Sequence, residues 1–293
     1  MEKILISFLV VFGLVLVGFS YWNLSPVPKA FLIKKAFERG MFIPSLGYEK
    51  ALQETKIFKD INYKSKFPDG TLDIVYPKDY TEKTPVIFWA HGGGFVGGDK
   101  SDITGYAVEL AAYGYTVVNI NYALAPKREY PTPVLQLGEA YEYIKENAKE
   151  YDLKLDRVYF AGHSAGAQKS GQLVNIQISP EYAKLTKISA IVDLFTIKGV
   201  LLFCGLYNMP ALAMMETTKE VQDFMRISGW AYLGEKDFEK LPEVEIASIF
   251  KYVTNDYPPA FIRDGNTALF EDQGKALVSA LQSTEVPVDI LIN

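Results

Sequence analysis

Short apolar runs alternate along residues 56–293 with segments whose apolar positions recur every three or four residues. The runs are typical of strands buried on both faces, and the segments of amphipathic helices. The expected strands are Lys56–Tyr63, Leu72–Tyr76, Pro85–Ala90, Tyr115–Ile120, Arg157–Ala161, Gly199–Phe203, Pro259–Arg263 and Val286–Ile292. The expected helices are Tyr106–Tyr113, Val134–Ala148, Gln168–Ile178 and Glu271–Gln282. This β-α-β rhythm predicts the α/β class, a mainly parallel sheet flanked by helices.

Residues 206–257 break this rhythm and are long for a connection. We interpret them as a cap inserted over one end of the sheet. Their large apolar side chains are Tyr207, Met209, Met214, Met215, Phe224, Met225, Trp230 and Tyr232. Such a set suits a hydrophobic acyl pocket and suits a plain packed lid equally well. The acyl length of a substrate is therefore left open.

The N-terminus carries no charge from Ile4 to Trp22. A helix over this stretch spans roughly 28 Å, close to the hydrocarbon thickness of a bilayer. Tyr21 and Trp22 then lie where interfacial aromatic residues are expected. We predict a single-pass transmembrane anchor over residues 1–24. The alternative is a signal peptide, with Gly18-Phe19-Ser20 as the cleavage region.

Residues 25–55 are predicted to form an amphipathic linker before the main domain at 56–293. Its first part is basic, and these basic residues are interleaved with apolar ones: Lys29, Lys34, Lys35 and Arg39 with Phe31, Leu32, Ile33 and Phe37. Such a segment suits a helix lying on a membrane surface, or an ordinary linker helix. Only Lys3 and the terminal amine precede the apolar span, whereas four basic residues follow it. The positive-inside rule weakly favours a cytoplasmic main domain on this count and leaves the side of the membrane open.

Composition and charge exclude several classes. The formal net charge is −5 and the pI about 5.3, without a basic stripe, which argues against a nucleic-acid binder. The single cysteine, Cys204, excludes an internal disulfide framework and a multi-cysteine metal site. We find no metal-binding cluster or cofactor motif, so no cofactor is expected. The two histidines, His91 and His163, are the only imidazoles available to any mechanism.

The sequence Gly162-His163-Ser164-Ala165-Gly166 follows a predicted strand and precedes a predicted helix. This is the context of the G-x-S-x-G nucleophile elbow. The glycines relieve crowding in a sharp turn that exposes the serine hydroxyl, and the helix N-terminus offers N–H groups to an oxyanion. The competing interpretation is a glycine-flanked helix cap.

A second glycine cluster, His91-Gly92-Gly93-Gly94, follows the strand Pro85–Ala90. Its backbone N–H groups are suited to an anion, as in the oxyanion loops of lipases and esterases. Together with Gly97 it also satisfies the dinucleotide pattern G-x-G-x-x-G. That alternative requires a helix at the glycines and an acidic residue after the next strand, and the sequence offers neither.

A third segment, Tyr122-Ala123-Leu124-Ala125-Pro126, lies between the two glycine clusters in the sequence. With the two glycine clusters in this order, residues 56–293 resemble the hormone-sensitive-lipase-like esterases of the α/β-hydrolase superfamily. The resemblance implies a serine carboxylic-ester hydrolase that acts on a small-molecule ester. Amide hydrolysis by the same residues is the close variant.

The resemblance also implies a role for each motif residue. Ser164 is the expected nucleophile, the N–H groups of Gly93, Gly94 and Ala165 the expected oxyanion hole, and His91 a structural support of that loop. The acid is expected after the strand Pro259–Arg263, which indicates Asp264. The family's usual spacing of this acid after a glycine is absent, so Asp272 and Glu271 remain alternatives.

The family's catalytic histidine lies after the last strand, and the sequence ends at Asn293, directly after Val286–Ile292. His163 is expected to point away from the serine hydroxyl, and His91 belongs to the glycine loop. We therefore expect the sequence to be truncated before its base. The alternative is a catalytically inactive hydrolase fold that serves as a binding module.

Overall fold

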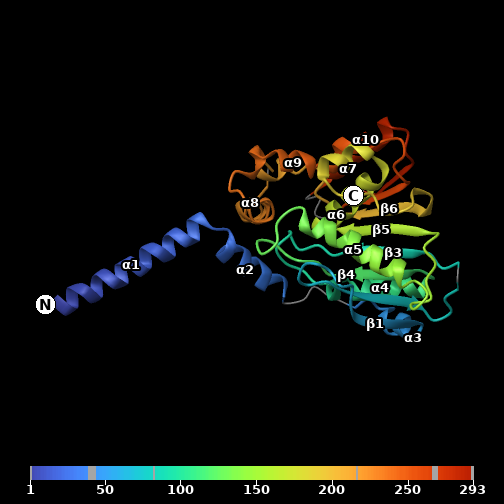
Figure 1. The fold of residues 1–293 in the computed structure, drawn as a ribbon, viewed down its shortest axis with the longest axis horizontal. Helices are drawn as coiled ribbons and strands as arrows, with labels where there is room; N and C mark the ends of the chain where they lie inside the picture. Colours follow the sequence, from blue (N-terminus) through green and yellow to red (C-terminus); the bar gives the residue numbers. More distant parts are fainter. Residues whose placement is uncertain (1, 39–43, 82, 216, 266–269, 292–293) are drawn as a thin grey trace.

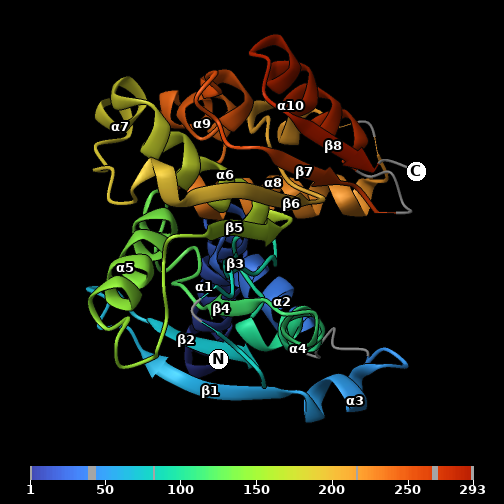
Figure 2. The same ribbon diagram turned by 90° about the vertical axis from the view of Figure 1, so that its right-hand side faces the viewer.

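An eight-stranded sheet forms the centre of the fold, with the strand order β1-β2-β4-β3-β5-β6-β7-β8. The computed structural model describes residues 2–38, 44–81, 83–215, 217–265 and 270–291. The strands are β1 (Thr55–Asn62), β2 (Thr71–Pro77), β3 (Val86–Ala90), β4 (Thr116–Ile120), β5 (Val158–His163), β6 (Ile197–Phe203), β7 (Ala260–Arg263) and β8 (Val288–Leu291). β2 pairs antiparallel with β1 and β4, and the other neighbours pair in parallel (Figure 2). The predicted α/β fold with a mainly parallel sheet is confirmed.

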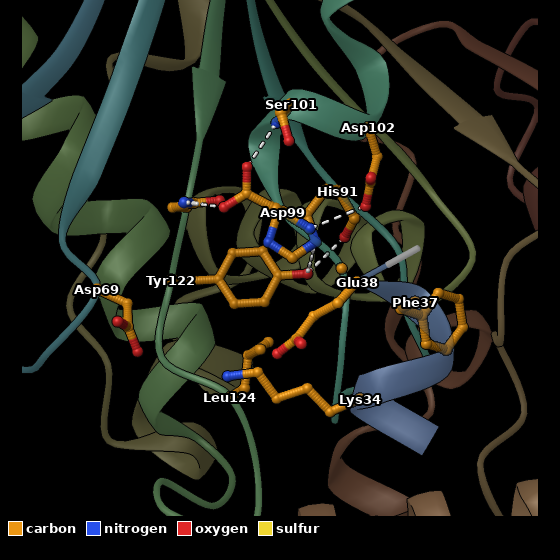
Figure 3. Close-up of a pocket in the computed structure, with 12 residues that line it drawn as sticks. Lys34, Phe37, Glu38, Asp69, His91, Asp99, Ser101, Asp102, Tyr122 and Leu124 are labelled. Atoms are coloured by element: carbon orange, nitrogen blue, oxygen red, sulfur yellow. Dashed lines mark hydrogen bonds between the residues drawn. The ribbon is translucent and has the colours of Figure 1, made fainter. Parts of the chain in front are cut away.

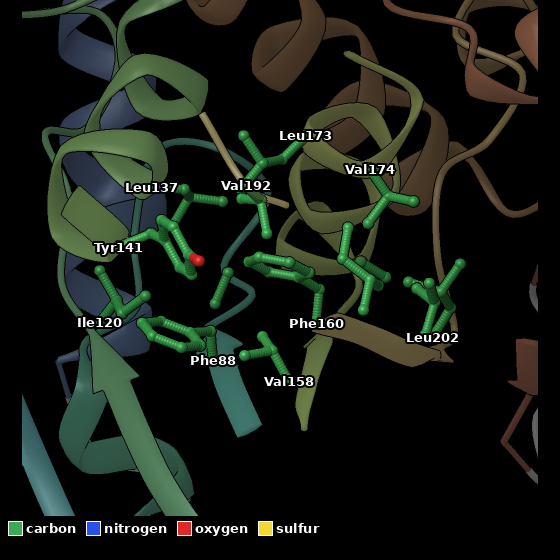
Figure 4. Close-up of a cluster of buried hydrophobic side chains, with 14 of the residues drawn as sticks. Phe88, Ile120, Leu137, Tyr141, Val158, Phe160, Leu173, Val174, Val192 and Leu202 are labelled. Atoms are coloured by element: carbon green, nitrogen blue, oxygen red, sulfur yellow. The ribbon is translucent and has the colours of Figure 1, made fainter. Parts of the chain in front are cut away.

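Helices cover both faces of the sheet. On one face lie α5 (Thr132–Glu146), α6 (Ala165–Ile178) and α10 (Glu271–Ser283), and on the other α4 (Thr104–Ala112). Phe88 and Phe160 point towards the first group and pack against Tyr141 of α5 (Figure 4). Because side chains alternate along a strand, their neighbours Ile87 and Trp89 point to α4 instead. The wholly apolar strand patterns follow from this double burial.

The chain between β6 and β7 contains η3 (Pro210–Ala213), α8 (Lys219–Leu233), η4 (Phe238–Lys240), α9 (Pro242–Ile246) and η5 (Ile249–Tyr252). These elements fall within 206–257, the segment predicted to be a cap. Phe95, which follows the glycine loop, stacks on Tyr232 of α8 at 4.0 Å between ring centroids. This segment therefore packs over the residues that follow β3.

Three helices precede the sheet: α1 (Glu2–Leu24), α2 (Val27–Phe37) and α3 (Tyr48–Gln53). α1 projects away from the rest of the molecule (Figure 1). Its window Lys3–Leu24 has a mean hydropathy of 2.5 and is 0% buried, so one helix is long and apolar enough to cross a membrane.

The range 25–55, predicted to be a linker, packs on the domain at both of its helices. α2 lies against α8, with Ala30 buried and Ile33 packed in the cluster that α8 shares with Phe95, and α3 lies against α4. The sequence pattern did not reveal this, because basic residues lie between the apolar ones on α2.

Two further local differences concern helices. α6 begins at Ala165, three residues before the predicted start, because small residues pack the strand-to-helix turn. The helix α7 (Pro180–Thr186) was not predicted; the Ser179 hydroxyl caps it by accepting from the N–H of Tyr182 at 3.1 Å.

Candidate active site

Ser164 lies in the sharp turn between β5 and α6. Its backbone has φ 52° and ψ −123°, a region that non-glycine residues occupy only when the surroundings impose it. Its N–H donates to the carbonyl of Phe203 at the end of β6 (2.8 Å). Gly166 must be glycine here, because a Cβ would lie 2.1 Å from the carbonyl oxygen of Ala90. The turn is thus locked between two strands with Ser164 at its apex.

The glycine loop after β3 packs directly against this turn. The Gly92 N–H donates to Nε2 of His163 at 3.0 Å. Gly93 has φ 110°, and a Cβ on it would lie 2.1 Å from the carbonyl oxygen of Gly97. Within the described part of the chain, the N–H groups of Gly93 and Gly94 have no acceptor. The Ala165 N–H, at the first position of α6, has no acceptor within the helix. Among the described residues, none of these three N–H groups donates to another backbone group, so all three can donate to an anion.

The start of the helix after the glycine loop argues against dinucleotide binding. The helical part begins only at η1 (Lys100–Ile103), six residues after Gly94, and α4 follows it. A dinucleotide fingerprint instead places its glycines at the start of the helix.

Both histidines are engaged by the glycine loop. His163 accepts from Gly92 through Nε2, and Nδ1 of His91 donates to the carbonyl of Gly92 at 2.7 Å. His91 also stacks on Tyr122, whose hydroxyl donates to the His91 carbonyl oxygen. Burial lowers the pKa of His163 to about 4 and that of His91 to about 3, so both imidazoles are neutral at pH 7.

These two buried imidazoles predict destabilisation by mild acid. An unfolded histidine has a pKa near 6.5, so between pH 6.5 and about 4 the unfolded state binds more protons than the folded state. The free energy of unfolding should therefore fall as the pH falls, by up to about 1.4 kcal/mol per pH unit for each histidine. Urea unfolding at pH 7, 6 and 5 measures the slope. His163→Gln keeps an acceptor for the Gly92 N–H and should lower the pH slope of the unfolding free energy by about the contribution of one histidine. An unchanged slope would contradict the conclusion that His163 is buried as a neutral imidazole.

Asp264 directly follows β7 and is 3% exposed. Its carboxylate accepts from the N–H of Gly265 (2.8 Å) and of Phe270 (3.1 Å). The thiol of Cys204 lies beside it, and burial together with the Asp264 carboxylate raises the pKa of that thiol. Two backbone donors thus hold the carboxylate at the end of its strand.

Ser164 and Asp264 lie at the carboxyl ends of β5 and β7, with β6 between them. At about 4.8 Å between neighbouring strands, the two residues are roughly 10 Å apart. A further side chain is therefore needed between them to relay a hydrogen bond from one to the other. The two alternative acids lie elsewhere on α10. Glu271 pairs with Lys275, and Asp272 is exposed. The structure thus places Ser164, Gly93, Gly94 and Ala165 at the carboxyl ends of the neighbouring strands β3 and β5, and it places Asp264 at the end of β7, two strands from β5.

A cavity of about 370 Å³ lies beside the glycine loop (Figure 3). Lys34, Phe37 and Glu38 of the α2 region close one side of it, and His91 and Tyr122 form part of the other. Among the described residues, its lining does not include Ser164. We therefore do not take this cavity as the ester-binding pocket.

One residue at this site, Lys169, was not predicted from the sequence. Its side chain is fully buried, and its amine donates to the carbonyl oxygen of Ala165 at 3.1 Å. The available signal was a charged residue inside the helix that follows the elbow, where every other position from 165 to 178 is apolar or uncharged.

Comparisons with known proteins identify the family and the fold. Residues 72–281 match the family described as BD-FAE. The chain is 26% identical over 232 residues to an acetyl esterase of Salmonella paratyphi B, covering 76% of this chain and 67% of that protein. Esterase B of Lactobacillus rhamnosis superposes with a TM-score of 0.72 at 22% identity, over 90% of this chain and 80% of that chain.

An esterase of Pyrobaculum calidifontis gives a TM-score of 0.68 at 20% identity, over 90% of this chain and 83% of that chain. These two structures share the α/β-hydrolase fold with the present one. The family match covers most of the chain, including the glycine loop and the elbow. The protein therefore belongs to the BD-FAE family and is a carboxylesterase-like α/β-hydrolase.

Proposed function

We propose that the protein cleaves carboxylic esters through an acyl-enzyme on Ser164. The Ser164 Oγ attacks the ester carbonyl carbon while its proton passes to a base, and a tetrahedral oxyanion forms. The oxyanion collapses, the alcohol leaves with a proton, and water then releases the acid from Ser164. The observation that carries the proposal is the imposed φ of 52° at Ser164, followed in sequence by Ala165, whose N–H has no acceptor within α6.

The N–H groups of Gly93, Gly94 and Ala165 are the proposed donors to the oxyanion. Each such donor contributes about 3 kcal/mol to transition-state stabilisation in a well-formed site. His91 supports this loop through its hydrogen bond to the Gly92 carbonyl. Asp264 is the proposed acid that orients and stabilises the protonated base.

Neither histidine of the sequence is assigned as that base. Both are neutral and hydrogen-bonded to Gly92, and no contact with the Ser164 hydroxyl is present among the described residues. This observation favours a second candidate, a hydrolase fold that binds esters or related ligands without turning them over. Covalent labelling of Ser164 separates the two candidates.

The test uses a fluorophosphonate probe on the protein expressed from its gene. An activated serine attacks phosphorus and displaces fluoride, so labelling requires both the nucleophile and its base. We expect stoichiometric labelling, located on the Ser164 peptide by mass spectrometry, and turnover of a short-chain ester such as p-nitrophenyl acetate. Absence of label and of turnover in a folded protein would favour the binding module.

We further propose that α1 anchors the protein in a membrane as a single pass. Its apolar stretch is fully outside the fold, and only Ser25 and Pro26 separate it from α2. α2 has apolar residues on two sides: Ala30 and Ile33 pack on the cap, whereas Phe31 and Leu32 are exposed. An outward apolar side next to a span suits the bilayer interface.

Fractionation of the producing cells tests the anchor. We expect the protein in the membrane fraction after alkaline carbonate washing, with its N-terminal residues intact by mass spectrometry. Replacing Leu9 and Val10 by lysine should release it, because each lysine costs about 3 kcal/mol at the centre of a span. Phe58→Lys and Tyr113→Lys, exposed positions on the domain, are matched controls. A soluble protein starting near residue 21 would identify a signal peptide instead.

A further inference from the structure

Lys169 is a buried cation that the proposed chemistry does not use. Its side chain is 0% exposed, and within the described residues its amine forms no ion pair. Placing an ammonium group in a core is costly, and burial lowers the pKa of Lys169 well below its usual value. An apolar residue of similar length would fill the same volume without that cost. The question is therefore what the amine contacts.

The amine contacts the elbow half of the proposed oxyanion hole directly and is connected to the loop half through Tyr122. On the elbow side it donates to the carbonyl oxygen of Ala165 at 3.1 Å. On the loop side it donates to the Tyr122 hydroxyl at 3.3 Å, and that hydroxyl donates onward to the carbonyl oxygen of His91. The two hydrogen-bond chains meet at one nitrogen atom. Either protonation state of the amine supplies the two N–H donors they require.

Aromatic rings complete the surroundings of the amine. It lies 4.6 Å from the ring centroid of Phe95, which follows Gly94, and 4.5 Å from that of Tyr122. Tyr232 of the cap helix α8 is 5.8 Å away and stacks on Phe95. Ring faces attract a cation, so these contacts offset part of its desolvation. Lys169, itself on α6, thus contacts the start of that helix, the residue that follows the glycine loop, the segment after β4 and the cap.

We propose that Lys169 is a positioning residue that fixes the glycine loop relative to the Ser164 elbow, and so sets the geometry of the oxyanion hole. This inference rests on the proposed function. Gly93 and Gly94 follow His91, whose carbonyl oxygen accepts from the Tyr122 hydroxyl, by two and three residues. Ala165 supplies one N–H donor of the oxyanion hole, and its own carbonyl oxygen accepts from the Lys169 amine. Small displacements of such donors reduce transition-state stabilisation far more than substrate binding.

The kinetic test compares Lys169→Met with the parent protein. Methionine keeps the length and removes the donors. We expect kcat per titrated active site to fall about 10- to 100-fold with KM changed less than about twofold, and the affinity for a trifluoromethyl ketone to fall in parallel with kcat/KM. Lys145→Met, at an exposed lysine, is the matched control. Lys169→Gln keeps an NH₂ donor group on a shorter side chain and should lie between the two.

A double-mutant cycle tests the route through Tyr122. If Lys169 acts on the loop through the Tyr122 hydroxyl, Lys169→Met combined with Tyr122→Phe should lose little more than the worse single variant. Losses that multiply would assign the two residues separate roles and overturn the relay.

Amide hydrogen exchange tests positioning without any turnover. In Lys169→Met we expect faster exchange than in the parent at the hydrogen-bonded amides of the loop and the elbow, which are Gly92, Gly97 and Gln168, with α5 unchanged. Unchanged exchange together with unchanged kcat per site would overturn the proposal. An inactive parent protein would refute the proposed function, yet the exchange result would still decide the role of Lys169. If Lys169→Met fails to fold, Lys169→Gln and Tyr122→Phe carry the same measurements.

Discussion

Ser164→Ala is expected to lower kcat for a short-chain ester by about 10⁶-fold, the order of loss seen when a serine protease loses its nucleophile. Alanine removes the only atom of this residue that forms the acyl bond. It also relieves no packing, because the turn is locked by Gly166 against Ala90 and by the hydrogen bond to Phe203. Residual turnover near the background of the uncatalysed reaction is the expected result, with no burst phase.

The control for this variant is a serine inside α6, the helix that Ser164 precedes. Ser170→Ala removes a buried hydroxyl that donates to the Ala161 carbonyl at 2.7 Å, six residues after Ser164. It should cost about 1 kcal/mol of stability and leave kcat within about twofold. Turnover by Ser164→Ala at the parent rate would refute the nucleophile assignment, whatever the labelling result.

The sheet was predictable because its strands are buried on both faces. Val86–Ala90 is a continuous apolar run and Thr116–Ile120 a mostly apolar one, and the ends of both strands were placed within one residue. The helix α6 was placed late because Ala165, Gly166 and Ala167 carry no helical apolar pattern. Gly166 instead allows close approach to the end of β3, which becomes visible only in the fold.

Contacts between distant segments were the part that the sequence did not predict. Phe37 of α2 lies 6.3 Å from Phe224 of α8 between ring centroids, and a Cβ on Gly94 would lie 2.4 Å from the Phe224 ring. Neither pattern nor spacing relates these positions, which are more than a hundred residues apart. The motifs located the proposed nucleophile and donors, whereas the residues that support them from other elements, Lys169 above all, required the fold.

These contacts also connect the proposed anchor to the proposed active site. α1 leads into α2 across two residues, α2 packs on α8, and α8 touches the glycine loop. The chain of contacts is continuous from the apolar span to the oxyanion donors. We infer that the position of the cap relative to the sheet is held partly by the segment that leaves the span.

Asp264→Asn is expected to lower kcat by about 10⁴-fold, the loss that follows removal of the buried aspartate in serine proteases. Asparagine keeps the shape but not the charge, so it no longer stabilises the protonated base. One of its two acceptor positions becomes an amide NH₂, which faces the N–H of Gly265 or Phe270. The unmet backbone donor should cost about 1–3 kcal/mol of stability as well.

Active-site titration and thermal unfolding separate the two effects of this substitution. A kcat per titrated site that falls about 10⁴-fold in a protein still folded at the assay temperature assigns the charge to the chemistry. The alternative acids supply the controls. Asp272→Asn, on the exposed side of α10, and Glu271→Gln, which removes only the surface pair with Lys275, should each leave kcat within about twofold. A large loss in either variant, with Asp264→Asn active, would move the acid to α10 and leave Asp264 as a residue that fastens the loop after β7.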